Sequence, residues 1–269
     1  MPEAFFLDAP GGGQRFCLFH RAERAHARVL YVHPFAEEMN KSRRMAALQA
    51  RAWQAAGVSV LQMDLLGCGD SSGDFGDAAW PDWLDDLQLA RHWLDGQGSA
   101  PLYLWGLRAG CLLASAAAER WGDVSGQLWW QPPTSGKPLV QQWLRLKLAG
   151  AMKAEGGAKL GLDDVRGQLR AEQVIDIAGY RCRAALLDGL EQARLSAPTG
   201  GRLGWFELSR ANPPALLPGS QQTMADWAAE PGAAALHAEA VNGPAFWQSA
   251  EIELAPQLLA RSVDWLKCP

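Results

Sequence analysis

The sequence predicts an α/β fold, in which a mostly parallel sheet is flanked by helices and carries an inserted helical cap. Short apolar runs alternate with helical stripes through most of the chain, which is typical of parallel sheets. The alternation stops between residues 134 and 198, where one helical pattern follows another. We therefore expect residues 1–133 and 199–269 to form the core and residues 134–198 to form the cap. The length of 269 residues agrees, because one α/β domain with an insertion often reaches roughly 250 residues.

Eight apolar runs predict the strands. The central ones are short, rich in β-branched or aromatic residues, and followed by turns, as expected of buried strands. The runs cover residues 5–8, 16–19, 29–33, 58–63, 102–105, 127–130, 202–208 and 233–241. We expect the first two to be edge strands.

Apolar residues at helical spacing predict the helices that pack on the sheet. The two clearest stripes are Met45, Leu48, Ala52 and Trp53, and then Trp83, Leu84, Leu87, Trp93 and Leu94 behind Pro81. An amphipathic pattern at residues 256–266 predicts a C-terminal helix.

The cap is predicted to contain helices and no strand. Its helices are expected at residues 139–152, 168–177 and 184–193. Glycine-rich segments at residues 155–158 and 198–201 are expected to be its internal and exit hinges.

Composition excludes several classes of protein. With 25 basic and 29 acidic residues the net charge is −4, so no broad basic field is available for nucleic acid. No apolar run is long enough for a transmembrane helix, and the N-terminus lacks the pattern of a secretory signal, so we expect a cytoplasmic protein. The five cysteines are widely spaced without a Cys-x-x-Cys pair, which favours reduced thiols and neither a metal nor another cofactor.

The most informative motif is Gly106-Leu107-Arg108-Ala109-Gly110, which joins a predicted strand to an alanine-rich helix. It has the form of a nucleophile elbow, where two glycines permit a sharp turn that exposes the middle residue at a helix N-terminus. Here the middle residue is Arg108. A guanidinium keeps its proton near neutral pH and is no nucleophile, so acyl-enzyme chemistry cannot start there.

A second segment, Gly69-Asp70-Ser71-Ser72-Gly73, matches the literal Gly-x-Ser-x-Gly pattern. It leads into another loop and not into a helix, so the structural context of a nucleophile is missing. We interpret Ser71 as a turn residue that hydrogen-bonds nearby backbone.

The other members of a Ser-His-Asp triad are also missing from their expected places. The segment after the last strand, residues 242–248, contains no histidine, and the segment after the preceding strand, residues 209–212, contains no carboxylate. His237 falls within a strand pattern and is interpreted as a packed or edge histidine. Cys68 and Cys111 are alternative nucleophiles, although Cys111 lies one turn into a helix, where burial is expected.

The elbow still suits an anion. The backbone N–H of Phe35 or Ala36 and that of Ala109 would form a pair of oxyanion-type donors, and Arg108 would add a positive charge. A carboxylate or phosphate ligand is one interpretation.

The other interpretation of Arg108 is an ion pair with Glu37 or Glu38 that joins two loops. The nearby Lys41, Arg43 and Arg44 are more simply a solvated first turn of a helix than an anion site.

Aromatic residues are expected to surround the elbow. Tryptophan contributes 13 of the 24 aromatic residues, and several of them fall near strand ends that would rim the site. The predicted lining consists of Trp105, Trp130, Gln131, Phe246 and Trp247. Trp247 stands near the place where a catalytic histidine would be expected, which favours a hydrophobic binding pocket over a working triad.

Several long segments together resemble the α/β-hydrolase superfamily and, within it, the exosortase A system-associated hydrolases of type 2. These segments are residues 34–45, 64–71, 73–77, 104–108, 130–132 and 243–247. The resemblance implies a bacterial protein linked to the sorting of PEP-CTERM proteins and to exopolysaccharide production. It also implies a hydrolase fold, while Arg108 departs from the catalytic pattern of the superfamily.

Three functions are compatible with these features. The first is a catalytically silent protein, or pseudoenzyme, that binds an anionic or acyl small molecule or a partner in exopolysaccharide or protein-sorting machinery. The second is an unconventional ester or thioester hydrolase or acyltransferase that uses Glu37 or Glu38 as a base and Arg108 as an electrophile. The third and weakest is membrane-surface binding through the basic, apolar helix at residues 139–152.

Overall fold

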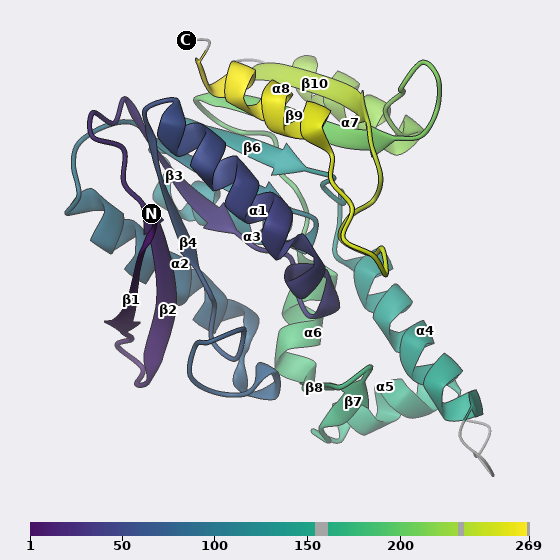
Figure 1. Ribbon diagram of the computed structural model, residues 1–269. Coiled ribbons are helices and arrows are strands. Elements are labelled where there is room, and N and C mark those ends of the chain that lie inside the picture. Colours follow the sequence, from purple (N-terminus) through teal and green to yellow (C-terminus); the bar gives the residue numbers. More distant parts are fainter. Residues whose placement is uncertain (154–160, 231–233, 268–269) are drawn as a thin grey trace.

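The computed structural model describes residues 1–153, 161–230 and 234–267 and contains one large sheet (Figure 1). Its strand order is β1-β2-β4-β3-β5-β6-β9-β10. The strands are β1 (Glu3–Asp8), β2 (Gln14–His20), β3 (Ala27–Val32), β4 (Val58–Met63), β5 (Leu102–Leu107), β6 (Gly126–Trp130), β9 (Arg202–Ser209) and β10 (Ala235–Asn242). Neighbouring strands along the order β4-β3-β5-β6-β9-β10 are all parallel. Strand β2 is antiparallel to both of its neighbours, β1 and β4. The predicted α/β fold is confirmed.

One prediction about the sheet edge is wrong. Residues 16–19 belong to β2, which is not an edge strand, because it pairs with β1 on one side and with β4 on the other. The short turn after Asp8 folds β1 back onto the outer side of β2, so β1 alone forms that edge. The last predicted run begins at residue 233, which lies outside the described residues, and the observed strand begins at Ala235.

Helices cover both faces of the sheet (Figure 1). One face packs against α1 (Glu37–Ala55) and α8 (Pro256–Lys267), and the other packs against α2 (Trp80–Asp95), α3 (Ala109–Trp121) and α7 (Pro218–Ala228). Each face has its own buried cluster, because side chains of successive strand residues point to opposite sides. The predicted stripes account for this packing, with Trp53 buried on the first face and Trp83 on the second.

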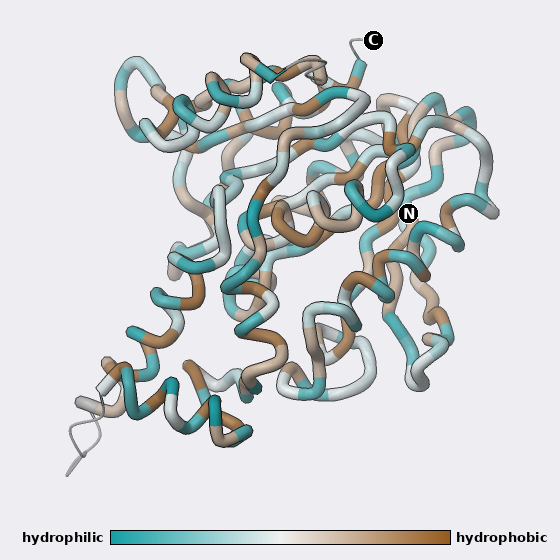
Figure 2. Tube along the Cα trace, turned by 180° about the vertical axis from the view of Figure 1, so that it is seen from behind, coloured by the Kyte–Doolittle hydropathy of each residue, from teal (hydrophilic) through white to brown (hydrophobic). Residues whose placement is uncertain are grey.

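The predicted cap segment contains α4 (Lys137–Lys153), α5 (Leu162–Arg170), β7 (Ile175–Ile177), β8 (Tyr180–Cys182) and α6 (Ala184–Gln192). Hydrophobic and hydrophilic positions alternate along its helices (Figure 2). The prediction of a segment without strands is wrong, since β7 and β8 form an antiparallel hairpin.

The predicted helix at residues 168–177 is also wrong. The helix ends at Arg170, and Ile175 and Ile177 are buried on either side of an exposed residue, which is strand spacing. The helix begins earlier than predicted because the Asp164 carboxylate accepts a hydrogen bond from the Gly161 N–H and caps its first turn.

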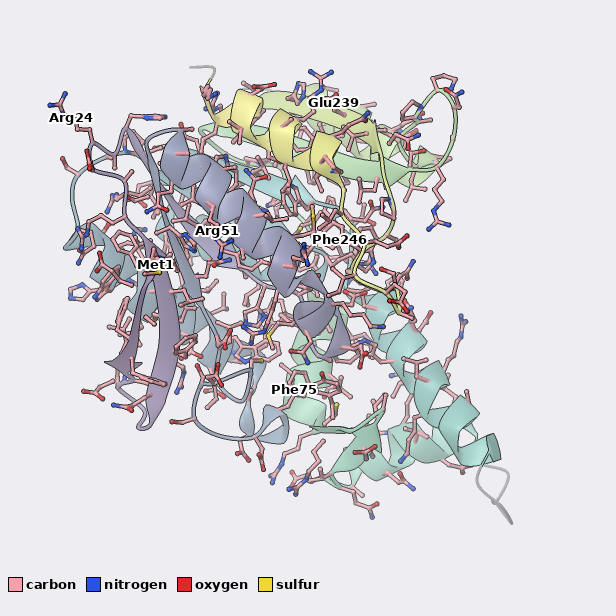
Figure 3. The ribbon with its side chains drawn as sticks, in the orientation of Figure 1. Met1, Arg24, Arg51, Phe75, Glu239 and Phe246 are labelled. Carbon is pink, nitrogen blue, oxygen red and sulfur yellow. The ribbon has the colours of Figure 1, made fainter. Side chains whose placement is uncertain are left out.

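An aromatic contact joins the cap segment to the core. Phe75, in the short helix η1 (Phe75–Asp77), lies at this junction (Figure 3). Its ring centroid is 5.7 Å from that of Trp83 in the core and 5.4 Å from that of Tyr180 in the hairpin. The division into core and cap stays a prediction, and the proposed hinge at residues 155–158 lies outside the described residues. None of the described helices has both the length and the apolar character needed to cross a membrane.

Candidate functional site

Three neighbouring strands end in strained backbone at the same edge of the sheet. Ala36, Arg108 and Gln131 follow β3, β5 and β6, and their φ angles are +52°, +54° and +46°. Residues other than glycine seldom adopt positive φ, and such strain of roughly 1–3 kcal/mol per residue concentrates at functional sites. The carboxyl ends of β3, β5 and β6 are therefore the candidate site.

The glycines of the elbow are required by close packing around Arg108. A Cβ atom at Gly106 would lie 2.6 Å from the Cα atom of Cys111, and one at Gly110 would lie 2.2 Å from the Val32 carbonyl oxygen. The Arg108 N–H donates to the Trp130 carbonyl at 2.9 Å, and α3 begins at the next residue. The turn therefore has the geometry of a nucleophile elbow with arginine at its apex.

The Arg108 guanidinium contacts Glu38 and Trp247. Its Nε and Nη2 atoms are each 3.3 Å from Glu38 Oε1, and its Cζ atom lies 5.5 Å from the Trp247 ring centroid. The side chains of Arg108 and Glu38 are 16% and 19% exposed, so this ion pair is mostly shielded from water. No residue that the structure describes accepts a hydrogen bond from Nη1. Arg108 thus joins the elbow to the first turn of α1 and keeps donors for a further partner.

Only one of the two adjacent glutamates reaches Arg108. Glu37 pairs with Lys41 at 3.4 Å on the same helix, and its side chain is 62% exposed. Lys41 also donates to the Gln248 carbonyl at 3.4 Å, which ties α1 to the loop that carries Trp247. Lys41 therefore helps to position the site through this loop.

Burial makes Glu38 an unusual carboxyl. Loss of hydration raises its pKa, and the neighbouring Arg108 charge opposes this only in part. Its second oxygen, Oε2, has no hydrogen-bond partner within the described ranges. Glu38 can therefore take up a proton more readily than an exposed glutamate, and it keeps one oxygen for water or a ligand.

The predicted backbone donors lie on adjoining turns. The start of α3 touches the loop after β3, because Gly110 packs against the carbonyl oxygens of Val32 and His33. The N–H groups of Phe35, Ala36 and Ala109 donate no hydrogen bond to any described residue. Ala109 is the first residue of α3, where free N–H groups and the helix dipole favour an anion.

His33 holds this loop and was not singled out from the sequence. Its Nδ1 lies 2.7 Å from the Pro34 carbonyl, and its Nε2 accepts from the Leu65 N–H at 3.2 Å. Burial lowers its pKa, so the ring stays neutral with both nitrogens engaged. His33 positions the loop and has no free nitrogen to act as a base.

Most of the predicted aromatic lining lies beneath the site. Trp105, Trp130 and Phe246 are at most 1% exposed and belong to the core on the α1 side. They form a chain of ring contacts that ends on Trp247, with centroids 4.7, 6.2 and 5.3 Å apart. Of this set only Trp247 contacts Arg108, so the other three rings support it from below.

Gln131 links two strands. Its Oε1 accepts from the Leu208 N–H at 2.8 Å, and its own N–H donates to the Phe206 carbonyl at 2.7 Å. These bonds fasten the end of β6 to β9, so the Gln131 amide oxygen is already engaged within the protein.

Ser71 and the two cysteines do not offer a substitute nucleophile. The Ser71 hydroxyl donates to the Asp64 carbonyl and accepts from the Phe16 N–H, which is the predicted turn role. Burial raises the pKa of the Cys68 thiol and raises that of Cys111 well above its usual range, so both stay protonated. His237 is half exposed and lies 3.4 Å from Glu239 on the edge strand β10, and no described serine or cysteine forms a hydrogen bond with it.

Among the three basic residues predicted to be a solvated turn, Lys41 and Arg43 form ion pairs with described residues. Arg43 lies 3.0 Å from Asp64, a partner that the sequence did not indicate. Arg44 is exposed, as predicted for a solvated turn. The described residues contain no group of three or more histidine, cysteine or acidic side chains arranged to hold a metal.

Comparison with known proteins agrees with the fold. Residues 23–176 match the sequence model of the family described as serine aminopeptidase, S33. No curated protein matches the sequence. Est1E from Butyrivibrio proteoclasticus, solved with ferulic acid bound, has a TM-score of 0.65 and 13% identity over 98% of this chain and 97% of that chain. GrgF from Penicillium sp. sh18 has a TM-score of 0.63 and 17% identity over 99% and 98%. Mouse alpha/beta hydrolase domain-containing protein 10 has a TM-score of 0.63 and 15% identity over 98% of both chains.

Proposed function

Because the chain belongs to the serine aminopeptidase S33 family of the α/β-hydrolase superfamily yet has arginine at the elbow, we propose that it binds an anionic or acyl small molecule without Ser-His-Asp catalysis. The observation that carries this proposal is the set of donors at adjoining turns: Arg108 Nη1 and the N–H groups of Ala36 and Ala109 donate to no described residue. An oxygen placed there would accept several hydrogen bonds at once, as an oxyanion does in an active relative.

The neighbours of Arg108 define the ligand further. Glu38 neutralises the guanidinium, so a bound anion adds a second negative charge to the pair. The raised pKa of Glu38 allows a proton to be taken up with the anion, which removes the repulsion. We therefore expect affinity for a carboxylate to increase as the pH falls toward the pKa of Glu38. Trp247 offers an apolar ring to the carbon part of the ligand.

Binding is tested by titration calorimetry with ferulate and with short acyl phosphates. Ferulic acid is a suitable first probe because Est1E binds it and because it is an aromatic carboxylic acid. We expect saturable binding that Arg108→Met weakens at least about tenfold, since a charged hydrogen bond contributes roughly 1.5–3 kcal/mol. Arg44→Met is the matched control, because Arg44 is exposed on α1. Equal binding by wild type and Arg108→Met would refute a site at the elbow.

The absence of triad chemistry is tested separately with a fluorophosphonate probe. The proposal expects no covalent labelling of the wild-type protein, because the apex residue has no nucleophilic oxygen. Labelling that is lost in Ser71→Ala would instead assign the nucleophile to the second glycine-rich motif.

The biological setting is proposed from the sequence resemblance. Residues 34–45, 64–71 and 104–108 support membership in the exosortase A system-associated type 2 group, and hence a cytoplasmic role beside PEP-CTERM sorting and exopolysaccharide production. Deleting the gene in its bacterium should alter exopolysaccharide yield or the sorting of a PEP-CTERM protein. Complementation with Arg108→Met should fail if ligand binding is the function. An unchanged phenotype on deletion would remove this link.

One observation favours a second candidate function, an unconventional ester or thioester hydrolase or acyltransferase. Glu38 has a raised pKa and an unbonded Oε2, which suit a general base for water, while Arg108 and the backbone donors would polarise the acyl oxygen. Glu37 lies outside this arrangement. Turnover of a short acyl thioester that Glu38→Gln abolishes and Glu37→Gln leaves unchanged would establish it. Absence of thioester turnover would rule out this second function and leave ligand binding as the only proposed function.

A further inference from the structure

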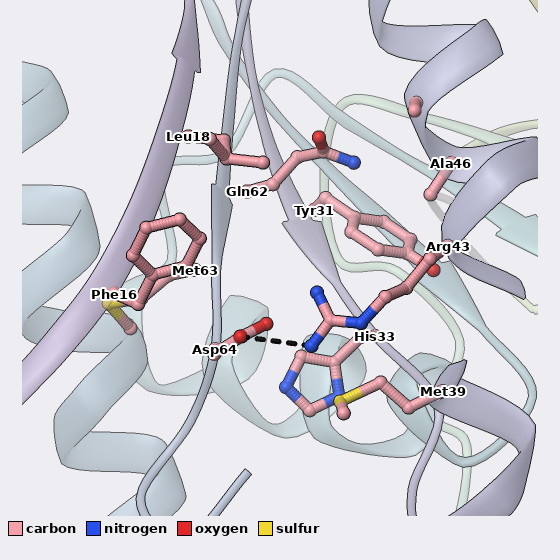
Figure 4. Close-up of a pocket in the computed structure, with 11 residues that line it drawn as sticks. Phe16, Leu18, Tyr31, His33, Met39, Arg43, Ala46, Gln62, Met63 and Asp64 are labelled. Carbon is pink, nitrogen blue, oxygen red and sulfur yellow. Dashed lines mark hydrogen bonds and ion pairs between the residues drawn. The ribbon is translucent and has the colours of Figure 1, made fainter. Parts of the chain in front are cut away.

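A cavity lies between α1 and the outer strands β2 and β4 (Figure 4). Its volume is about 180 Å³, and its apolar walls include Phe16, Leu18 and Met39. Tyr31, Gln62, Arg43 and Asp64 also line it, while Arg108, Glu38 and Trp247 do not. We call it the Tyr31 cavity; His33, which holds the loop of the elbow site, also lines it, but none of the groups proposed to contact the anion does.

The Tyr31 hydroxyl opens onto this cavity without a partner. The side chain is 6% exposed, and its ring packs against Trp105 with centroids 4.1 Å apart. The hydroxyl forms no hydrogen bond with any described residue. Tyr31 Oη is not among the fully buried polar atoms that lack a partner, so the hydroxyl is accessible and can donate to water or to a ligand oxygen in the cavity. Burial raises the pKa of Tyr31, which keeps the hydroxyl neutral and able to donate.

The charged groups at the cavity neutralise each other. Arg43 Nη2 lies 3.0 Å from Asp64 Oδ2, which also accepts from the Asp70 N–H at 3.0 Å (Figure 4). The Arg43 side chain is 42% exposed, so this pair lies between the cavity and solvent. An anionic ligand would compete with Asp64, and a cationic one would compete with Arg43. The electrostatics therefore favour a neutral ligand.

We propose that the Tyr31 cavity binds a neutral, ring-sized organic molecule whose oxygen accepts a hydrogen bond from Tyr31. A cavity of about 150 Å³ in another protein accommodates benzene, so 180 Å³ has room for one six-membered ring with a carbonyl or ether oxygen. The ring packs against Phe16, Leu18 and Met39, and the oxygen reaches Tyr31. This site is distinct in place and ligand charge from the proposed anion site at Arg108.

A matched pair of probes tests the assignment. Cyclohexanone and methylenecyclohexane have nearly the same shape, but only the ketone accepts a conventional hydrogen bond. We expect the protein to bind both and to prefer the ketone by about threefold to tenfold, the contribution of one neutral hydrogen bond. Saturation-transfer NMR or a thermal-shift titration gives the two affinities.

Two conservative variants locate the binding. Tyr31→Phe removes only the hydroxyl, so it should abolish the preference for the ketone while binding of methylenecyclohexane remains. Tyr103→Phe is the matched control, because Tyr103 lies on the neighbouring strand β5 and does not line the cavity. The Tyr103→Phe variant should prefer cyclohexanone over methylenecyclohexane as strongly as the wild type does.

A filling variant tests the space itself. Ala47 lines the cavity and is only partly buried, so Ala47→Leu should block both probes while the protein stays folded. Thermal unfolding of each variant checks the fold. Absence of saturable binding of either probe to the wild type, or a ketone preference that survives Tyr31→Phe, overturns the proposal. Arg108→Met should leave cyclohexanone binding unchanged, which separates this result from that of the elbow site.

Discussion

The two turns that lead into α1 and α3 have nearly the same backbone and opposite chemistry. Ala36 precedes α1 with φ +52° and ψ −132°, and Arg108 precedes α3 with φ +54° and ψ −124°. Both follow buried parallel strands that are neighbours in the sheet. The comparison shows that the strained turn itself is a property of strand-to-helix connection here, while side chains decide what each turn does.

The difference lies two residues after each apex. After Ala36 this position holds Glu38, whose carboxylate reaches Arg108, whereas after Arg108 it holds Gly110, which packs against the Val32 carbonyl. One turn therefore projects a charge, and the other leaves out a side chain so that α3 can approach β3. A single ion pair between the two turns results from this asymmetry.

Gly110→Ala should cause the largest loss of stability. The new Cβ atom would lie 2.2 Å from the Val32 carbonyl oxygen, a backbone atom that cannot move aside alone. We expect the free energy of unfolding to fall by about 3 kcal/mol, at the upper end of overpacking effects. Chemical denaturation measures it. Gly167→Ala is the control, because that helical glycine has open space around it and alanine should stabilise by roughly 0.5–1 kcal/mol. If Gly110→Ala instead lowers the free energy of unfolding by less than Gly167→Ala raises it, then α3 can move away from β3 to make room for the new methyl group.

Arg108→Met should have the next largest effect. It leaves the buried Glu38 carboxylate without its partner, and we expect a loss of about 2 kcal/mol near neutral pH. Adding Glu38→Gln to the Arg108→Met variant should restore most of the lost stability, since the unpaired charge is then gone. Denaturation of the two single variants and the double variant gives the coupling. Strict additivity would mean that the ion pair contributes nothing to stability.

The pH dependence of that loss sharpens the comparison further. Burial raises the folded-state pKa of Glu38 above the usual value of a glutamate, and removing Arg108 should raise it more, because the guanidinium opposes the effect of burial. The folded state then binds the proton more tightly than the unfolded chain, so stability increases as the pH falls through the folded pKa. The deficit of Arg108→Met should shrink on acidification by part of those roughly 2 kcal/mol. A deficit that is constant with pH would contradict protonation of Glu38.

Ala36→Gly should have the smallest effect and the opposite sign. Glycine removes the strain at φ +52° but increases the entropy of the unfolded chain, so we expect a net gain of about 0.5 kcal/mol. Arg108→Gly relieves similar strain but also breaks the ion pair, and it should destabilise the protein. Thermal unfolding compares the two. If Arg108→Gly stabilised the protein, then relief of backbone strain would outweigh the loss of the ion pair, contrary to our expectation.

Local patterns predicted most of the sheet and the helices on it. Alternating strand and helix signals located all eight strands of the large sheet, because most of these strands are short apolar runs. The β7 and β8 hairpin escaped prediction because three-residue strands are too short for a pattern to emerge, and Ile175 and Ile177 were assigned to a helix. The pairing of Arg43 with Asp64 was also missed, since it joins residues 21 positions apart across the sheet edge.

By itself the sequence determined the elbow, its arginine and the lack of a histidine in residues 242–248, since these depend on residue identity at places set by local backbone. Only the tertiary structure decided that Glu38 and not Glu37 meets Arg108. Adjacent residues on a helix point about 100° apart, and the packing of α1 against the sheet selects which one faces the site. It also placed Trp105 and Trp130 below the site, because the face of a sheet that a strand residue occupies is fixed by pairing with its neighbours, and packed Phe246 from the loop after β10 against Trp130.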